Sequence, residues 1–325
     1  MKPSPVSVVI PSYDDVDLLA LNLPVLVAEL DARKIGDEVI VVDDTGRGAV
    51  EAWIAETFPE PETFARATVE VRCVVRASNG GFAKAVFDGA EAASHGQMMV
   101  LNPDVRVRSG FLAPLQACLA HADVAAVVPR VLLNGSENHV ESLTRFAWID
   151  GRFEVLEHGE SIDEREIVEP TPVPFALGGA MLVRRAEFLR ERGFDALFQP
   201  FYWEDVDYGW RAWRAGARIL LAPDSVVEHH HRGSIGRAIP PEIVRAAIDR
   251  NRLLFTWKHL EGEARIAAHL DALSAQVIDA VAEGREDDLR ALLLALDEVQ
   301  HVNRSRAARR KAARSFDEIL RDAQA

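Results

Sequence analysis

Residues 38–44, Glu-Val-Ile-Val-Val-Asp-Asp, are a short run of β-branched residues that ends in two aspartates. An apolar run of this length, closed by polar residues, is typical of a strand buried on both faces of a sheet. Similar runs occur at residues 6–10, 69–75, 98–101 and 124–128, with segments of helical apolar spacing between them. This alternation predicts an α/β fold with a mostly parallel sheet covered by helices on both faces.

The polar residues that close these strands are the first candidates for a site, because ligands of such sheets bind beyond the carboxyl ends of the strands. They are Ser12-Tyr13-Asp14, Asp43-Asp44, residues 76–81 and Asn102-Pro103-Asp104.

Composition narrows the class of protein. The chain has 325 residues, 48% hydrophobic and 27% charged, a balance that excludes a mostly disordered protein. Its 37 basic and 51 acidic residues give a net charge of −14, which argues against a nucleic-acid partner. The two cysteines cannot form a disulfide framework, no apolar run approaches the roughly 20 residues of a membrane span, and no signal peptide is recognisable. We therefore expect a cytoplasmic protein.

The pattern changes twice along the second half of the chain. Residues 134–174 are polar and predict irregular structure with a short hairpin around Asp150-Gly151. Beyond residue 236, glycine and proline become rare while Ala, Leu, Arg and Glu dominate, which predicts three or four helices that begin at Pro240-Pro241. The expected division is a sheet domain at 1–236 and a helical extension at 237–325. Between these stretches we expect strand-like runs at 180–183, 218–221 and 225–227 and helices at 186–192 and 205–215.

Asn102-Pro103-Asp104 follows a buried strand on a tight proline turn. A carboxylate there points into the ligand crevice, and Mg²⁺ usually binds one or two carboxylates together with substrate phosphates. The alternative is a solvated turn aspartate, since such sequences commonly mark turns.

Glu204-Asp205-Val206-Asp207 opens a predicted helix, directly after the aromatic run Phe201-Tyr202-Trp203. Acidic residues are expected in a first helical turn because the helix dipole favours them, and this alone explains part of the motif. A carboxylate beside aromatic rings that stack on a sugar could instead act as general base towards a hydroxyl, and the helix N-terminus should keep it ionised near neutral pH.

Two further motifs suggest anion or metal contacts. At most one or two members of His229-His230-His231 can reach one ion, because successive strand residues face opposite ways. Arg232 then offers a cation suited to a diphosphate. Asn79-Gly80-Gly81-Phe82 opens a helix whose N-terminus favours anions. The G-x-G-x-x-G, Walker and G-x-S-x-G motifs are absent, which disfavours a nicotinamide dehydrogenase, a P-loop kinase and an α/β-hydrolase.

Taken together, these motifs are far more specific than any one of them. The set comprises residues 6–13, 38–44, 79–83, 101–105, 178–183, 204–207 and 229–234, with a further match at 251–255. It resembles glycosyltransferase family 2, inverting enzymes of the GT-A fold, and most of all the bacterial rhamnosyltransferase-like subgroup, over roughly residues 5 to 236.

The resemblance implies a role for each matching residue. Pro11, Tyr13 and Asp43 match positions that line the nucleotide base, and Asn79 and Gly81 match the start of the helix on the donor side. Asp104 matches the last carboxylate of the D-x-D metal motif, and His229 matches a histidine that binds the metal in some members. Asp205 matches the general base, with Glu204 beside it. One position departs: Asn102 stands where the motif has its first aspartate. Metal binding through a single carboxylate and the diphosphate is therefore expected.

The implied activity is transfer of a sugar from a nucleotide-diphosphate sugar to a hydroxyl of a saccharide or lipid-linked saccharide in cell-surface polysaccharide synthesis. The resemblance implies Mg²⁺ or Mn²⁺ as cofactor and favours dTDP- or UDP-sugars over guanosine donors. Rhamnosyl transfer is one such reaction. A sugar-1-phosphate nucleotidyltransferase would need a G-x-G-x-R loop where this chain has Pro11-Ser12-Tyr13. A non-catalytic nucleotide-sugar-binding scaffold is the other alternative, and retention of Asp104, Asp205 and His229 argues against it.

The C-terminal extension carries a basic run in an acidic chain: Arg304, Arg306, Arg309, Arg310, Lys311 and Arg314. One interpretation is a solvated helix face. The other is peripheral contact with anionic lipid headgroups at the inner membrane face, which would bring the protein to a lipid-linked acceptor. Self-association through these helices also stays open.

Overall fold

The computed structural model describes residues 3–58, 69–136, 139–157, 167–230, 239–308 and 311–324. Its main sheet comprises β1 (Val6–Ser12), β2 (Glu38–Asp43), β3 (Glu70–Val75), β4 (Gln97–Leu101), β5 (Val105–Val107), β6 (Val124–Leu133), β9 (Thr171–Pro172), β10 (Ala180–Arg184) and β11 (Arg218–His229). The strands lie in the order β3-β2-β1-β4-β10-β6-β11-β5, and β9 pairs with β11 beside this path.

The sheet is mixed around a parallel half. β3, β2, β1 and β4 run parallel, as do β6 and β11, whereas β10 is antiparallel to both of its neighbours. The expected α/β class and the five predicted strands are confirmed. The two strand-like runs predicted at 218–221 and 225–227 are one strand, β11, interrupted by an irregularity between Ala222 and Val226.

The helices of the sheet region are α1 (Val16–Asp31), α2 (Ala49–Thr57), α3 (Phe82–Ala92), α4 (Leu112–Leu119), α5 (Arg185–Arg190) and α6 (Glu204–Arg214). α3 packs on β1 and β2, and α4 packs on β6 and β11. α3 approaches the sheet so closely at Gly89 that an added Cβ would lie 2.3 Å from a methyl carbon of Val9. A glycine is therefore required at this contact.

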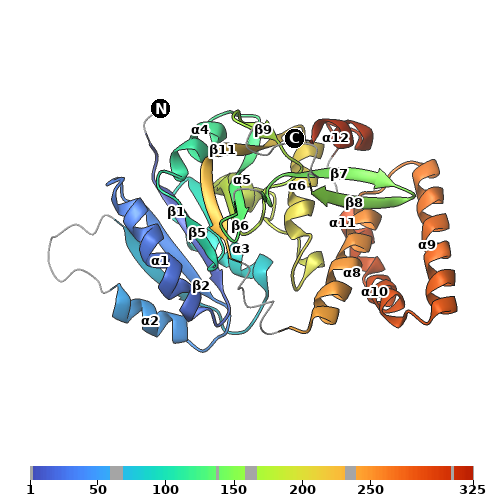
Figure 1. Ribbon diagram of the computed structural model, residues 1–325, viewed down its shortest axis with the longest axis horizontal. Helices are drawn as coiled ribbons and strands as arrows, with labels where there is room; N and C mark the ends of the chain where they lie inside the picture. Colours follow the sequence, from blue (N-terminus) through green and yellow to red (C-terminus); the bar gives the residue numbers. More distant parts are fainter. Residues whose placement is uncertain are drawn as a thin grey trace.

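The predicted hairpin is present and projects away from the main sheet. β7 (Thr144–Ile149) and β8 (Arg152–Glu157) pair antiparallel, and the turn residues Asp150 and Gly151 have φ values of 47° and 76°. Figure 1 shows the hairpin reaching towards the C-terminal helices, and β8 contacts the first of them.

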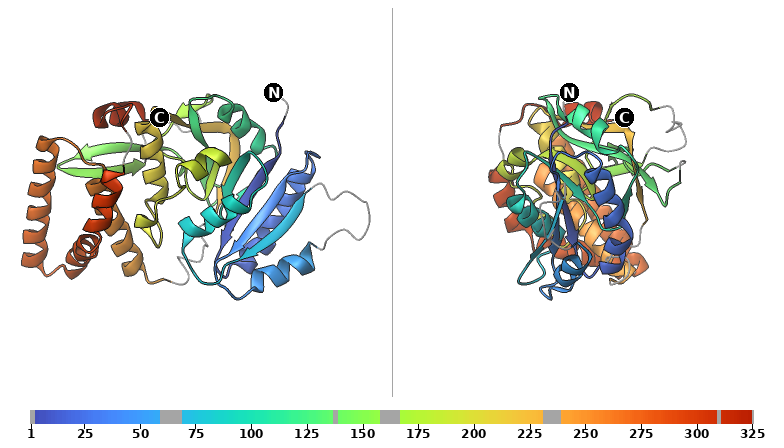
Figure 2. Two further views of the ribbon diagram at one scale, coloured as in Figure 1. Left: turned by 180° about the vertical axis from the view of Figure 1, so that it is seen from behind. Right: turned by 90° about the vertical axis from the view of Figure 1, so that its left-hand side faces the viewer.

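Five helices follow within the described residues, where the sequence predicted three or four. They are α8 (Pro241–His259), α9 (Glu263–Glu283), α10 (Glu286–Leu296), α11 (Val299–Ala307) and α12 (Phe316–Asp322). They occupy the end of the molecule opposite α2 (Figures 1 and 2). Phe255 of α8 and Phe316 of α12 belong to the same buried cluster as Phe153 of the hairpin and Trp210 of α6. The apolar core therefore continues across residue 236, and the two-domain division stays a prediction.

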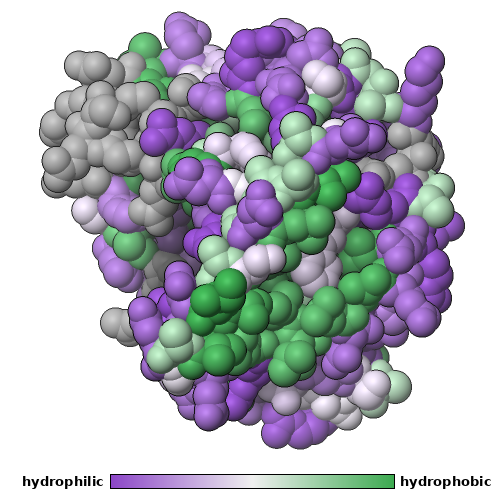
Figure 3. Space-filling view, turned by 90° about the vertical axis from the view of Figure 1, so that its right-hand side faces the viewer, coloured by the Kyte–Doolittle hydropathy of each residue, from purple (hydrophilic) through white to green (hydrophobic). Residues whose placement is uncertain are grey.

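The outer side of α9 and α10 exposes a band of apolar side chains, visible as the green area in Figure 3. The exposed large apolar residues of these helices are Ile266, Leu270, Ile278, Val281, Leu293, Leu294 and Leu296. None of the helices in the described ranges combines the length and apolar character needed to cross a bilayer.

Candidate active site

Three neighbouring strands end side by side at one edge of the sheet. β1 lies between β2 and β4, and Ser12 pairs with Asp43 in the parallel register. Pro11 is buried within β1, whereas Tyr13 just beyond it is 41% exposed. Asp43 is fully buried, and its Oδ1 accepts hydrogen bonds from the N–H and the hydroxyl of Thr45 at 2.9 and 2.6 Å. Its Oδ2 is buried and has no hydrogen-bond partner among the described residues.

The turn before α3 is anchored to the end of β2 by Asp44. This carboxylate accepts hydrogen bonds from the N–H of Gly80 at 2.9 Å and of Gly81 at 2.8 Å, and it pairs with Arg76. Arg76 also binds Asp88 on α3 at 2.6 Å. The two glycine N–H groups thus bind a carboxylate of the chain itself, and Asp44 fixes the position of the helix start.

The side chain of Asn79 also faces this turn, because its Oδ1 accepts a hydrogen bond from the N–H of Gly81 at 2.9 Å. Gly81 has a φ of 79°, and a Cβ there would lie 3.1 Å from the carbonyl oxygen of Pro200. Backbone conformation and space both require glycine at this position.

Asp104 and His229, the predicted metal ligands, lie next to each other. Pairing of β5 with β11 places Val105 opposite His229, which brings the histidine beside the preceding aspartate. The Nε2 atom of His229 is 3.4 Å from Oδ2 of Asp104, and its Nδ1 atom is 2.7 Å from Oε2 of Glu141. Burial alone would lower the pKa of His229, but hydrogen bonds and charge from Asp104 and Glu141 raise it to about 10.

This pair fits a divalent cation that is shared with a phosphate ligand. Among the described residues no group of three or more His, Cys, Asp or Glu side chains could hold a metal by itself. Asp104 would supply one oxygen ligand and His229, on giving up its second ring proton, one nitrogen ligand, and the remaining positions would be filled by diphosphate oxygens and water, as Mg²⁺ commonly prefers. Glu141 orients the imidazole through its other nitrogen, a common arrangement around metal-binding histidines.

The rest of the histidine motif contributes less. The Nε2 atom of His230 lies 3.5 Å from Glu228. His231 and the predicted diphosphate contact Arg232 lie outside the described residues.

Two consecutive glycines join the Asn-Pro-Asp turn to the first turn of α6. The N–H of Asn102 donates to the carbonyl of Gly179 at 2.8 Å, and the N–H of Gly178 donates to Oδ2 of Asp205 at 2.9 Å. A Cβ on Gly179 would lie 2.4 Å from the side-chain nitrogen of Asn102, so only glycine permits this approach. The predicted base Asp205 and the predicted metal-binding turn are therefore hydrogen-bonded to adjacent residues, Gly178 and Gly179.

Burial shifts the pKa values of Glu204 and Asp205 upwards, against the expected effect of the helix N-terminus, and ionisation of Asp205 near neutral pH stays a prediction. Glu204 is 7% exposed, and its Oε2 has no partner among the described residues. Burial, reinforced by the charge of Asp205, raises the pKa of Glu204 well above its usual value. Burial also raises the pKa of Asp205, against the opposing hydrogen bonds from Gly178 and Val206. Desolvation thus outweighs the helix N-terminus, and Asp205 is a stronger proton acceptor than a solvated aspartate once it is ionised.

Only one ring of the predicted aromatic wall is exposed. Phe201 and Trp203 are 6% and 8% exposed, and Trp203 packs on Phe153 and Phe255. Tyr202 is 41% exposed. Burial, followed by the charges of Glu204, Asp104 and Asp205, raises the pKa of Tyr202, which places its hydroxyl in the field of both acidic motifs. Tyr202 is therefore the available stacking surface.

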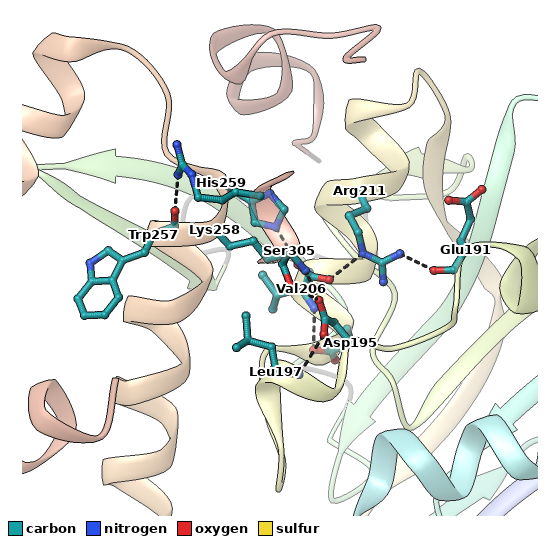
Figure 4. A network of polar contacts seen from close by, with 12 residues as sticks. Glu191, Asp195, Leu197, Val206, Arg211, Trp257, Lys258, His259 and Ser305 are labelled. Carbon is teal, nitrogen blue, oxygen red and sulfur yellow. Dashed lines mark hydrogen bonds and ion pairs between the residues drawn. The ribbon is translucent and has the colours of Figure 1, made fainter. Parts of the chain in front are cut away.

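Asp207, the third acid of the motif, is a buried ion-pair centre. Its Oδ1 lies 2.6 Å from Nζ of Lys258 and 2.7 Å from Nε2 of His259, and its Oδ2 lies 2.7 Å from Nε of Arg211. Burial alone would raise the pKa of Asp207, but Lys258, Arg211 and His259 hold it well below the usual value. Figure 4 shows Lys258 and His259 of α8 directed towards the helix that carries Arg211. The network connects the base-bearing helix to the C-terminal extension.

Part of the basic run serves the same connection. Arg306 donates to the carbonyls of Trp257 and Leu260 at the end of α8. Arg314 donates to the carbonyls of Gly216 and Ala217 after α6. Arg309 and Arg310 lie outside the described residues.

Sequence reasoning did not assign the partners Asp44, Arg76 and Glu141. Asp44 was visible as a strand-closing acid, but its bond to the glycine turn depends on the β2–β3 register. Glu141 is 88 residues from His229 in the chain, and no local pattern marks it.

The chain is similar in sequence to known glycosyltransferases. The chain is 29% identical over 200 residues to the pre-mycofactocin glycosyltransferase of Mycobacterium tuberculosis, covering 61% of this chain and 38% of that protein. It is 25% identical over 252 residues to polypeptide N-acetylgalactosaminyltransferase 6 of Bos taurus, covering 74% and 39%. The chain thus spans less than two fifths of the length of these curated relatives.

Solved structures share the fold. GalNAc-T7 with UDP, GalNAc and Mn²⁺ superimposes with a TM-score of 0.62 at 18% identity, covering 88% of this chain and 54% of that one. A mannosyltransferase from Pyrobaculum calidifontis in complex with GDP-Man and Mn²⁺ gives 0.53 at 16%, covering 90% and 87%. These neighbours are GT-A glycosyltransferases, so the expected fold is confirmed. The profile described as "Glycosyltransferase like family 2" matches residues 3–240, and the chain therefore belongs to that family.

Proposed function

We propose that this chain transfers a sugar from a nucleotide-diphosphate sugar to an acceptor hydroxyl, with inversion at the anomeric carbon. The observation that carries the proposal is the Gly178-Gly179 bridge, because it holds Asp205 next to the Asn-Pro-Asp turn. A single displacement needs a proton acceptor close to the site that holds the leaving diphosphate, and this arrangement supplies both.

On the donor side, Pro11, Tyr13 and Asp43 would border the nucleotide base, and the unpartnered Oδ2 of Asp43 would accept a hydrogen bond from it. Asn79 and Gly81 would border the donor beyond the turn that Asp44 anchors. A uracil or thymine ring carries an imide N–H that matches such an acceptor. UDP- and dTDP-sugars are therefore the proposed donors.

At the diphosphate, Asp104 and His229 would hold Mg²⁺ or Mn²⁺, with Glu141 orienting the imidazole. When bound, the cation supplies charge neutralisation for the leaving diphosphate. The backbone N–H of Asn102 holds the turn by donating to Gly179. Because Asn102 carries an amide and not a carboxylate, Asp104 would be the one carboxylate ligand of the motif. Arg232 stays a proposed diphosphate contact.

On the acceptor side, Asp205 takes the proton from the attacking hydroxyl while the sugar bond to the diphosphate breaks. The oxygen–carbon bond forms on the face opposite the leaving group, so no covalent enzyme intermediate is needed. Glu204 has no hydrogen-bond partner for Oε2 among the described residues, and burial together with the charge of Asp205 raises the pKa of Glu204 well above its usual value. Tyr202 offers its ring to an acceptor sugar.

The finer parts of the proposal follow from the family resemblance. They are a saccharide or lipid-linked saccharide acceptor, a role in cell-surface polysaccharide synthesis, rhamnosyl transfer as one candidate reaction, and a cytoplasmic location with peripheral membrane contact. A non-catalytic nucleotide-sugar-binding scaffold is the alternative.

Release of UDP or dTDP from a panel of nucleotide sugars, with p-nitrophenyl glycosides as acceptors and Mn²⁺ present, tests the proposal. The wild type should release nucleotide with at least one pair, and NMR of the product should show the inverted anomer. Asp205→Asn should lower turnover by about 10²–10⁴-fold with UDP affinity unchanged, and Glu204→Gln is the matched control. Binding of UDP without turnover of any pair would favour the scaffold.

A further inference from the structure

Residues 198–203 connect two parts of the site, because the side chain of Gln199 donates to the carbonyl of Gly80 and the segment leads directly into α6. Its last residue precedes Glu204, the first residue of α6, and its exposed ring is Tyr202. Tyr202 and Trp203 have φ values of 69° and 76°, in the left-handed region that ordinary residues rarely adopt. Such a backbone persists only where the surrounding structure holds it in place.

Asn251 of α8 holds this loop. The residue is fully buried, and its amide nitrogen lies 2.8, 3.0 and 2.9 Å from the carbonyl oxygens of Phe198, Phe201 and Tyr202, so its two N–H groups are shared among three acceptors. Its side-chain oxygen accepts a hydrogen bond from Arg250 at 2.7 Å, which fixes the orientation of the amide. One side chain from the C-terminal helices therefore fastens the loop at three points.

Arg250 adds a fourth point and connects the loop to the rest of the extension. Its guanidinium donates to the carbonyl of Gln199 at 2.8 Å and pairs with Glu298 at 3.3 Å. The side chain of Gln199 in turn donates to the carbonyl of Gly80 at 2.8 Å. The donor-side turn does not depend on this contact, because Asp44 binds it separately.

We propose that Asn251, oriented by Arg250, is a positioning residue for the acceptor side, holding the 198–203 loop so that Tyr202 and Asp205 meet the acceptor in one geometry. The inference rests on the proposed glycosyl transfer. It gives α8 a role in the reaction although the helix lies beyond the strands that form the site. Loss of the clamp should impair use of the acceptor and leave nucleotide binding intact.

The test compares Asn251→Ala and Arg250→Gln with Thr256→Ala. Thr256 is also buried in α8, but among the described residues its hydroxyl donates to the carbonyl of Arg252 in its own helix and not to the 198–203 loop, so it controls for loss of a polar group from α8. Three quantities are measured: UDP affinity with Mn²⁺ by calorimetry, kcat and acceptor KM with the best donor and p-nitrophenyl glycoside pair, and hydrogen exchange of peptides covering 198–206.

Both clamp variants should lower kcat by about 100-fold and raise acceptor KM, since small displacements of reacting groups have effects of this size. They should leave UDP affinity unchanged and increase exchange in 198–206, while Thr256→Ala matches the wild type. If Asn251→Ala does not fold, Arg250→Gln alone decides, because it leaves the buried amide in place.

Wild-type turnover in Asn251→Ala or Arg250→Gln would overturn the proposal. So would equal losses in Thr256→Ala, or a parallel loss of UDP affinity, because either would mean general destabilisation. A wild type inactive with the whole panel would refute the proposed function instead, and the exchange data would still show whether Asn251 holds the loop.

Discussion

Replacement of Asp207 by asparagine should be among the most destabilising single changes at the junction of α6 and α8. The carboxylate is fully buried, and Lys258 is 3% exposed, so the substitution leaves a buried ammonium group without its nearest anion. Removing one partner of a buried ion pair typically costs about 3–5 kcal/mol. The low end applies here, because Lys258 keeps Asp195 at 2.7 Å and Arg211 keeps two backbone carbonyls.

A loss of about 3 kcal/mol translates into a measurable shift in Tm. With an unfolding entropy of about 2.1 cal/mol/K per residue, a chain of 325 residues that unfolds as a unit should lose roughly 4–5 °C. Differential scanning calorimetry measures this shift. Asp322→Asn is the control, because its pair with Arg321 is exposed and such pairs contribute little. A shift for Asp207→Asn no larger than for Asp322→Asn would refute the reasoning.

The same variant predicts a dependence on pH. Because the native pKa of Asp207 is held well below the usual value of 3.8, its stabilising contribution is fully present above pH 3.8 and is lost as the pH falls towards the lowered native pKa. The difference in Tm between wild type and Asp207→Asn should stay constant from pH 7 to about pH 5 and narrow in stronger acid. A difference that grows on acidification would mean that the carboxylate is not held ionised by its cationic neighbours.

Two further predictions concern the metal pair and the basic run. Asp104→Ala should abolish the Mn²⁺-dependent part of UDP affinity in calorimetry, and His229→Ala should reduce it less, since carboxylate and diphosphate oxygens remain; undiminished binding in Asp104→Ala would exclude the metal role. Arg306→Gln should lower the free energy of unfolding by about 1.5 kcal/mol, because the carbonyls of Trp257 and Leu260 lose a charged donor. Lys311 is exposed, and Lys311→Gln should leave the free energy of unfolding unchanged. Equal effects of the two substitutions would favour the interpretation of the basic run as a solvated helix face.

The ion pairs of Asp207 and the hydrogen bonds of Asn251 both join the C-terminal helices to the segment at residues 198–207. Asp207 and residues 198–203 belong to the segment that carries the proposed base Asp205, and both are held by side chains of α8. The energetic coupling of the two parts therefore runs through polar contacts as well as through the shared aromatic core. We therefore expect a substitution in α8 to affect the acceptor side without contacting the acceptor.

The sequence by itself determined the positions of the strands in the first half, the edge at which the site was expected, and the identity of Asp104, His229 and Asp205 as candidates. These follow from local patterns, since a buried strand and the polar residues that close it are adjacent in the chain. Only the tertiary structure decided the rest. The raised pKa values of Glu204 and Asp205, the burial of Phe201 and Trp203, and the roles of Asp44, Glu141, Asp207 and Asn251 arise from desolvation and from partners that are distant along the chain. Local patterns cannot show either, because both depend on which segments the fold brings together.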